Sequence, residues 1–123
     1  MQSGRITILG IPIDNVTEAE ALARAHSFLQ DGGWHQICTV NPEFIMEARR
    51  NPTFRSVLQA ADLNTPDGFG VLVAARRQGT PLRGRVTGVE LTLGLAQLAA
   101  KYGYRMFLLG AAPGVAEAAA AVL

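Results

Sequence analysis

The sequence contains almost no cysteine, no long hydrophobic run and almost no net charge. Cys38 is the single cysteine among 123 residues, so no disulfide can form within the chain. Apolar stretches such as residues 70–75 are far shorter than the ~20 residues of a membrane-spanning helix. Residues 1–5 have no apolar core, so we expect no secretory signal there. These absences argue against a disulfide scaffold and a membrane span, and they favour a reducing cytoplasm.

Nucleic-acid binding and metal chemistry have equally little support. Eleven basic and ten acidic residues give a formal net charge of +1, which predicts no strong attraction to nucleic acid. His26, His35 and Cys38 lack the spacing of a metal-ligand set, and the chain has no Asp-x-Asp pair. We therefore expect neither a metal nor a cofactor.

The few charges are unevenly distributed. Residues 1–48 hold two arginines and six acidic residues (net −4), whereas residues 49–85 hold seven arginines and two acidic residues (net +5). Within the basic block, one stretch without a carboxylate contains Arg76, Arg77, Arg83 and Arg85. This stretch is either a solvated basic face or the place where an anionic ligand binds, because guanidinium groups match phosphate oxygens.

Strand and helix signals alternate along the chain. Strands are predicted at residues 5–9, 35–40 and 105–109, with a short extended piece at 62–64; the apolar run 105–109 is typical of a strand buried on both faces. Helix starts are marked by two capping boxes, Thr17/Glu20 and Thr87/Glu90, and by Asn-Pro pairs at residues 41–42 and 51–52. Glycines at positions 32, 79 and 103 mark helix ends.

This alternation predicts an α/β fold with a mostly parallel sheet flanked by helices, Rossmann-like in architecture. Residues 1–123 have the length of one domain. The last predicted helix follows a strand, and a crossover helix normally leads to a further strand. We therefore expect the chain to be the N-terminal part of a longer domain, truncated at its C-terminus.

Asp67 is the first candidate for chemistry. It lies in a Thr-Pro-Asp-Gly turn, residues 65–68, directly after the short extended piece. Strand ends are where α/β proteins place active groups, and a carboxylate held there can act as general base toward a sugar hydroxyl. The alternative is ordinary turn chemistry, for which Pro-Asp-Gly is common.

Three further segments offer binding groups. Thr39 and Asn41 are two residues apart at a strand end, so their side chains face the same way and suit hydroxyl recognition, unless Asn41 simply caps the next helix. Arg85 lies in a loop that enters a capped helix, and this combination suits a diphosphate, unless the loop is merely exposed. The turn from Gly110 through Pro113 to Gly114 has the strand–turn–helix layout of nucleotide-phosphate sites, although it also serves plain packing.

Taken in order, these segments resemble the WecG/TagA/CpsF family of bacterial glycosyltransferases. The matching stretches cover nearly the whole chain and are residues 13–17, 39–43, 61–70, 85–88 and 107–116. Each motif is unspecific by itself, whereas the ordered set is specific. Position 40 is valine where many family members have proline.

The resemblance implies a reaction and a location. It implies inverting transfer of an N-acetylmannosamine-type sugar from a UDP donor to a sugar on a polyprenyl diphosphate, in the synthesis of teichoic acid or another cell-surface polysaccharide. It also implies a cytoplasmic protein at the inner face of the plasma membrane, which touches the membrane through a C-terminal region that this chain lacks.

By matched position, the resemblance makes Asp67 the general base and Arg85 the group that meets the diphosphate. The further positions that it implies are Thr39 and Asn41 lining the site, and Gly110, Pro113 and Gly114 near the UDP half. Two other hypotheses stay open: a non-catalytic nucleotide-binding module built on the Gly110–Gly114 turn, and an inactive truncated fragment. The apolar C-terminal helix also predicts a homo-oligomer.

Overall fold

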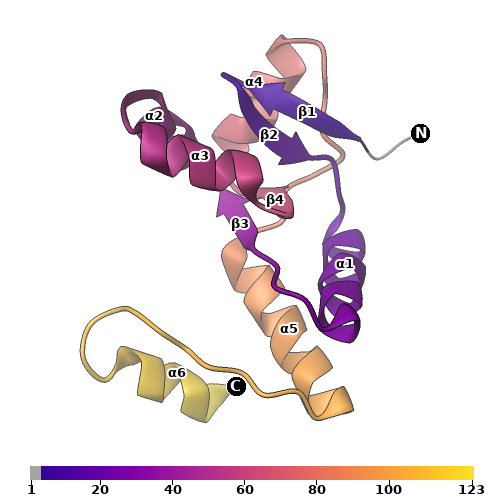
Figure 1. Cartoon of the computed structure of the whole chain (residues 1–123), viewed down its shortest axis with the longest axis vertical. Helices are drawn as coiled ribbons and strands as arrows, with labels where there is room; N and C mark the ends of the chain where they lie inside the picture. Colours follow the sequence, from indigo (N-terminus) through magenta and orange to yellow (C-terminus); the bar gives the residue numbers. More distant parts are fainter. Residues whose placement is uncertain (1–3) are drawn as a thin grey trace.

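The structure, a computed structural model, describes residues 4–123; Met1–Ser3, part of the segment in which we expect no signal sequence, lie outside the described residues. Helices and strands alternate as in an α/β protein (Figure 1). The elements are β1 (Arg5–Ile8), β2 (Ile11–Asp14), α1 (Glu18–Asp31), β3 (Ile37–Val40), α2 (Pro42–Arg50), α3 (Pro52–Ala60), β4 (Leu63–Pro66), α4 (Phe69–Arg77), α5 (Gly88–Tyr102) and α6 (Val115–Val122).

The first two strands form an antiparallel hairpin, which the sequence analysis missed because it predicted only one strand there. Ile8 pairs with Ile11 across a two-residue turn, and both turn residues, Leu9 (φ 50°) and Gly10 (φ 82°), have positive φ. That combination is typical of the type I′ turn, whose twist matches that of paired strands. Ile11 and Ile13 in β2 are fully buried, so the hairpin is part of the core.

β3 and β4 form the parallel pair that the α/β prediction requires. Thr39 lies opposite Thr65 and Val40 opposite Pro66, so the two strands end side by side. Helices α2 and α3 connect the two strands, as in a βαβ crossover. The α/β prediction is thus confirmed and is consistent with a Rossmann-like fold, with two two-stranded sheets in the part of the chain that the structure describes.

The predicted helix boundaries are confirmed where local chemistry specifies them. Thr17 and Thr87 each accept the backbone N–H of the glutamate three residues on, and that glutamate accepts the N–H of the threonine. Asn41 and Asn51 cap α2 and α3, each followed by proline at the first helical position. Gly32 and Gly103 end α1 and α5 in the left-handed conformation.

Two groups of buried side chains hold these elements together. The first joins the hairpin, β3, α2, α3 and α4, and includes Ile11, Ile13, Val40, Leu58 and Val71. The second lies between α1, β4 and α5, and its members are Val16, Ala21, Leu63, Val86 and Leu91. The parallel pair therefore has a packed layer on each side, and its strand ends are held rigidly.

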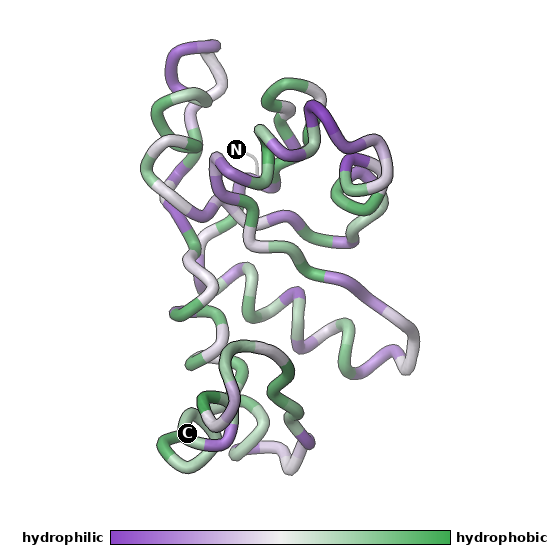
Figure 2. Tube along the Cα trace, turned by 90° about the vertical axis from the view of Figure 1, so that its left-hand side faces the viewer, coloured by the Kyte–Doolittle hydropathy of each residue, from purple (hydrophilic) through white to green (hydrophobic). Residues whose placement is uncertain are grey.

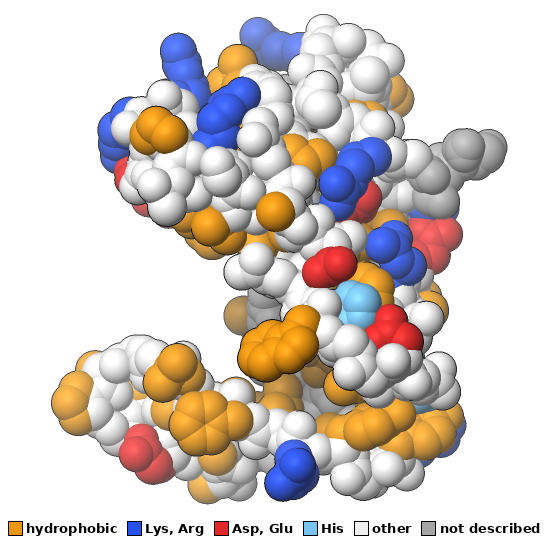
Figure 3. Space-filling view, in the orientation of Figure 1, with side chains coloured by type: hydrophobic (Ala, Val, Ile, Leu, Met, Phe, Trp, Pro, Cys, Tyr) orange, Lys and Arg blue, Asp and Glu red, His pale blue; other side chains and the backbone are white. Residues whose placement is uncertain are grey.

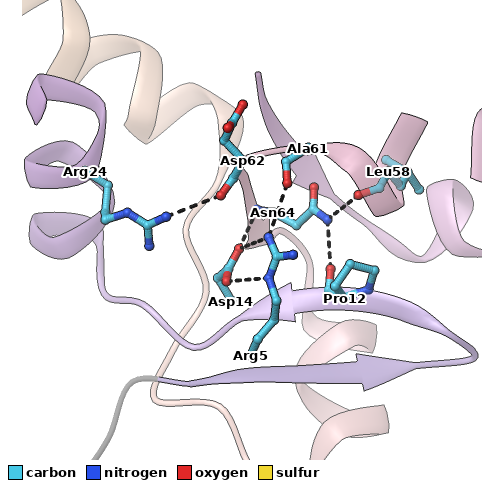
Figure 4. Close-up of polar contacts among 8 residues, drawn as sticks. All are labelled: Arg5, Pro12, Asp14, Arg24, Leu58, Ala61, Asp62 and Asn64. Atoms are coloured by element: carbon cyan, nitrogen blue, oxygen red, sulfur yellow. Dashed lines mark hydrogen bonds and ion pairs between the residues drawn. The ribbon is translucent and has the colours of Figure 1, made fainter. Parts of the chain in front are cut away.

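A buried polar network links the hairpin to the parallel pair (Figure 4). Asn64 in β4 is fully buried, and its Nδ2 donates to the carbonyls of Pro12 (2.9 Å) and Leu58 (2.8 Å). Its backbone N–H donates to Asp14 Oδ2 (2.7 Å), and the Asp14 carboxylate also pairs with Arg5. These bonds fix the position of β4, and with it the turn that follows.

The predicted strand at residues 105–109 is wrong, because these residues form an irregular segment. Phe107 and Leu109 are 85% and 90% exposed. An apolar run favours burial, but a strand also needs a neighbour for its backbone N–H and C=O groups, and none pairs with this segment within the described residues. The Trp34 side chain is likewise 99% exposed.

The C-terminal helix stands apart from the rest of the fold. Figure 1 shows α6 beside α5 and away from the sheets, and in Figure 2 this end of the chain is largely hydrophobic in colour. No residue of α6 is buried. The space-filling view shows a hollow between α6 and the body formed by α2 and α3 (Figure 3). Among residues 4–123, no helix combines the length and apolar composition needed to cross a bilayer.

Candidate functional site

The paired ends of β3 and β4 bring three of the predicted site residues together. Asn41 and Asp67 each follow a member of the register pair Val40–Pro66, and the Asp67 backbone N–H donates to the Val40 carbonyl (2.9 Å). Thr39 lies one residue before this point on β3. The site therefore lies at the carboxyl edge of a parallel pair, where α/β proteins bind ligands.

The Asp67 carboxylate is anchored at the N-terminus of α5. Its Oδ2 accepts the backbone N–H of Gly88 at 3.0 Å. A Cβ built on Gly88 would lie 3.3 Å from Thr39 Oγ1 and 3.8 Å from Asp67 Oδ2. Thr39, Asp67 and the bare backbone of Gly88 thus converge, although Thr39 lies in β3, Asp67 directly follows β4, and Gly88 lies 21 residues after Asp67.

The segment that leads into α5 is fixed by the same strand. The Val86 backbone N–H donates to the Pro66 carbonyl at 2.7 Å, and the Thr65 hydroxyl lies 3.4 Å from the Val86 carbonyl. Val86 is fully buried. As a result, the first residues of α5 cannot move independently of the turn that carries Asp67.

Carboxylates already occupy the N-terminus of α5. Besides Asp67, the Glu90 side chain accepts the backbone N–H of Thr87 at 3.3 Å and its hydroxyl at 3.0 Å. The partial positive charge of this helix end therefore stabilises two anionic side chains. The expectation that this helix end also helps to bind a diphosphate stays a prediction.

Asn41 has the structural role that the sequence analysis left open. Its Oδ1 accepts the backbone N–H of Phe44 at 2.9 Å and so caps α2. Its side chain is also close to the turn, since a Cβ on Gly68 would lie 3.8 Å from Asn41 Cβ. Asn41 therefore shapes the rim of the site, and its amide NH₂ is the group left to contact a ligand.

The arginines of the basic stretch do not gather at one point. Arg83 forms an ion pair with Glu20 and donates its backbone N–H to Asn15 Oδ1 (2.9 Å), which ties the loop to α1. The Arg83 guanidinium lowers the pKa of Glu20. Arg76 and Arg77 lie in the last turn of α4, about 10–12 Å along the helix from its first residue at ~1.5 Å per residue.

Arg85 is the arginine of this stretch that stays available near Asp67. It is exposed, forms no ion pair within the described residues, and lies two positions before Thr87, the N-cap of α5. The structure shows no direct contact between Arg85 and Asp67. An open groove of about 440 Å³ begins at Gly88 and runs between α5 and α6, with Val89, Leu93 and Val122 on its walls.

The predicted donor-binding turn is not brought to this edge. Gly110, Pro113 and Gly114 are exposed, and nothing lies within 4 Å of a Cβ built on either glycine. In Figure 1 this turn lies next to α6, away from the ends of β3 and β4. Its assignment to the UDP half of the site stays a prediction. Within residues 4–123, no cluster of three His, Cys, Asp or Glu side chains could hold a metal ion.

Gly88 is the site residue that the sequence analysis missed. The signal was present, because a glycine follows the Thr87 N-cap at a position where helices do not need one. Its meaning depends on the approach of Asp67 and Thr39, which only the tertiary structure shows.

Comparison with known proteins gives a consistent family. The family model described as "Glycosyl transferase WecG/TagA/CpsF family" matches residues 6–123. The chain is 41% identical over 76 residues to the N-acetylglucosaminyldiphosphoundecaprenol N-acetyl-beta-D-mannosaminyltransferase of Bacillus spizizenii, a match that covers 62% of this chain and 30% of that protein. It is 30% identical over 119 residues to the protein of the same name from Staphylococcus aureus strain NCTC 8325, covering 95% of this chain and 47% of that protein. The chain thus spans less than half the length of these relatives.

Proposed function

The chain belongs to the WecG/TagA/CpsF family of glycosyl transferases, and on that premise we propose that it is an inverting glycosyltransferase with Asp67 as its general base. The donor is a UDP-linked sugar of the N-acetylmannosamine type, and the acceptor is a sugar on a polyprenyl diphosphate. The names of the Bacillus and Staphylococcus relatives support the acceptor and the transferred sugar.

The position of the Asp67 carboxylate is the observation that carries this proposal. One oxygen is held by the Gly88 N–H, while Oδ1 accepts no hydrogen bond from the described residues. The side chain is half-buried, so it is both oriented and accessible. A base needs this combination, because it must point one lone pair at the hydroxyl proton that it removes.

The reaction then proceeds as a single displacement. The Asp67 carboxylate takes the proton of the acceptor hydroxyl, whose oxygen forms a bond to the anomeric carbon while the bond from that carbon to the UDP oxygen breaks. UDP leaves with the electron pair, and Asp67 later releases its proton to water. Thr39 and Asn41 hold acceptor hydroxyl or acetamido groups, since each offers a donor and an acceptor.

Arg85 meets the negative charge that develops on the leaving diphosphate. It is exposed and not engaged in an ion pair within the described residues, whereas Arg83 is bound to Glu20. A guanidinium can bind two phosphate oxygens at once.

A lipid-linked acceptor would place the protein at the inner face of the plasma membrane, in the synthesis of teichoic acid or a related surface polysaccharide. Contact with the membrane, the Gly110–Gly114 turn as part of the UDP site, and self-association through α6 belong to the same proposal. The exposed apolar side chains of Phe107, Leu109 and Val122 support an association surface at that end of the chain.

The test is transfer from a UDP-N-acetylmannosamine donor to a polyprenyl-diphosphate-linked N-acetylglucosamine acceptor. We expect Asp67→Asn to lower turnover by ~10²–10⁴-fold, the usual contribution of a positioned base. We expect Arg85→Ala to lower it by ~10²–10³-fold, the scale of a lost charge stabiliser. Matched controls are Glu18→Gln and Arg77→Ala, which change exposed side chains outside the site and should leave turnover unchanged.

Undiminished turnover in Asp67→Asn would remove Asp67 as the base and with it the proposed mechanism. Equal losses in Arg85→Ala and Arg77→Ala would show that general positive charge matters rather than a placed guanidinium.

A further inference from the structure

We infer that the backbone amide of Gly88 is a positioning group for the base, and that its missing side chain keeps open the notch between Thr39 and Asp67. The inference rests on the proposed role of Asp67 and adds a residue to that site.

The Gly88 N–H is a donor without a helical partner. Gly88 is the first residue of α5, and the first four N–H groups of a helix have no acceptor within the helix. Here the N–H donates to Asp67 Oδ2 at 3.0 Å. Because this oxygen is engaged, Oδ1 is the oxygen that faces a substrate, and the carboxylate cannot rotate freely.

Thr39 and Asp67 lie so close to position 88 that a side chain there would contact both of them. A Cβ there would lie 3.3 Å from Thr39 Oγ1, closer than most real Cβ contacts, and 3.8 Å from Asp67 Oδ2. Any side chain would thus occupy the space between the hydroxyl and the carboxylate. Glycine leaves that space for the acceptor hydroxyl, which must lie within hydrogen-bond reach of Asp67.

The amide is itself held in place. Val86 is buried and bonded to Pro66, the residue before Asp67, and the Thr87–Glu90 capping box fixes the start of the helix. The donor and the carboxylate therefore belong to one rigid unit. A hydrogen bond in such a unit orients a side chain better than one from a flexible loop.

Two substitutions at Gly88 distinguish the effect of its N–H from the effect of the space that glycine leaves open. Gly88→Pro removes the N–H at a position where helices accept proline, and Thr87 already has the extended conformation (φ −80°, ψ 156°) that a residue before proline requires. Gly88→Ala keeps the N–H and adds only the Cβ. The difference between the two variants reports the loss of the donor to Asp67 together with the ring Cδ that takes the place of the N–H hydrogen.

We expect Gly88→Pro to lower kcat by about 10- to 100-fold, the range for a hydrogen bond to a charged group, with little change in the KM for the UDP donor. Gly88→Ala should also keep the KM for the UDP donor and should lower kcat less, because it retains the donor to Asp67. The charged residues on the neighbouring segments, Glu43, Arg85 and Glu90, are the same in all variants.

An NMR titration tests the same bond without substrate. The amide proton of Gly88 should change its chemical shift as Asp67 titrates in the parent protein, and it should stay constant in Asp67→Asn. This measurement keeps the inference testable if Gly88→Pro does not fold. A Gly88 shift that behaves alike in both proteins would overturn the inference, as would equal losses of kcat in Gly88→Pro and Gly88→Ala. If Asp67→Asn loses activity and one of these results is found, the Gly88 inference is wrong but the proposed function stands. If Asp67→Asn keeps full activity, the proposed function is wrong, and the NMR titration alone then tests the hydrogen bond between Gly88 and Asp67.

Discussion

Replacing Asn64 is the sharpest test of how the fold positions the site. Its side chain is fully buried, and its Nδ2 donates to two carbonyls, those of Pro12 in β2 and Leu58 in α3 (Figure 4). Asn64→Ala removes both hydrogen bonds and leaves the Pro12 carbonyl without its donor, whereas the Leu58 carbonyl keeps the backbone N–H of Ala61 (3.4 Å). The backbone bond from residue 64 to Asp14 is retained, so the variant tests the side chain alone.

The expected loss follows from these contacts. Each hydrogen bond contributes about 1 kcal/mol, and the unsatisfied Pro12 carbonyl adds to the penalty, so we expect Asn64→Ala to lower the free energy of unfolding by about 2–4 kcal/mol. That is a large part of the ~5–15 kcal/mol stability of a typical domain. With a urea m-value of ~1–1.5 kcal/mol/M, the midpoint should fall by ~2 M.

Asn64→Asp makes a second, more specific prediction. The carboxylate keeps the shape of the side chain but turns its donor into an acceptor that faces two carbonyls. In the folded protein this carboxyl favours its protonated form, which still donates one hydrogen bond. The penalty is therefore smallest well below the ordinary aspartate pKa of about 4, where the group is protonated in both states, and it grows as the pH rises. At neutral pH we therefore expect Asn64→Asp to be less stable than Asn64→Ala.

Urea unfolding followed by far-ultraviolet circular dichroism measures both variants. Fluorescence is a poor probe, because Trp34, the single tryptophan, is already 99% exposed in the folded chain. Gln30→Ala, on the exposed surface of α1, is the control and should change stability by less than ~0.5 kcal/mol. A loss below about 1 kcal/mol in Asn64→Ala, or a neutral-pH Asn64→Asp as stable as the parent, would refute the reasoning.

Two further predictions concern titratable groups outside the site. A hydrogen bond to Asp31, supported by Asp62, raises the pKa of His35, so its contribution to stability is complete below its unfolded pKa of ~6.5 and is lost as the pH rises through the folded value. Thermal unfolding of the parent and His35→Gln should therefore differ more at pH 6 than at pH 9; a constant difference would contradict this. Burial raises the pKa of the Cys38 thiol, so alkylation by iodoacetamide at pH 8 should be slower in the folded protein than in urea, and equal rates would show that the thiol is freely accessible.

Local chemistry in the sequence determined where most helices begin and end. Thr17 and Thr87 carry their capping partners three residues away, and Asn41 is followed by the proline that starts α2. Such signals act within one turn of the chain, so they do not depend on what the helix later packs against. Asp67 could also be identified as a candidate in this way, because its turn chemistry and its place after an extended segment are both local.

Contacts between distant segments decided the features of the fold that local signals could not predict. The run at residues 105–109 has the composition of a buried strand, yet it stays exposed because no second strand receives its backbone groups. Asn64 looks like an interruption in an apolar strand until the carbonyls of Pro12 and Leu58 are placed beside it. The sequence shows that a polar group requires a hydrogen-bond partner or that an apolar run favours burial. Which partner or surface meets that requirement depends on the packing of the whole chain.

The candidate site shows the same division. Local patterns identified Asp67, Thr39 and Arg85 as an available carboxylate, hydroxyl and guanidinium. Packing in three dimensions brought the first two to the bare backbone of Gly88, whose N–H at the start of α5 donates to Asp67. Hydrogen bonds act over about 3 Å, and distances on that scale between residues 21 or more positions apart are set by the packing of strands and helices.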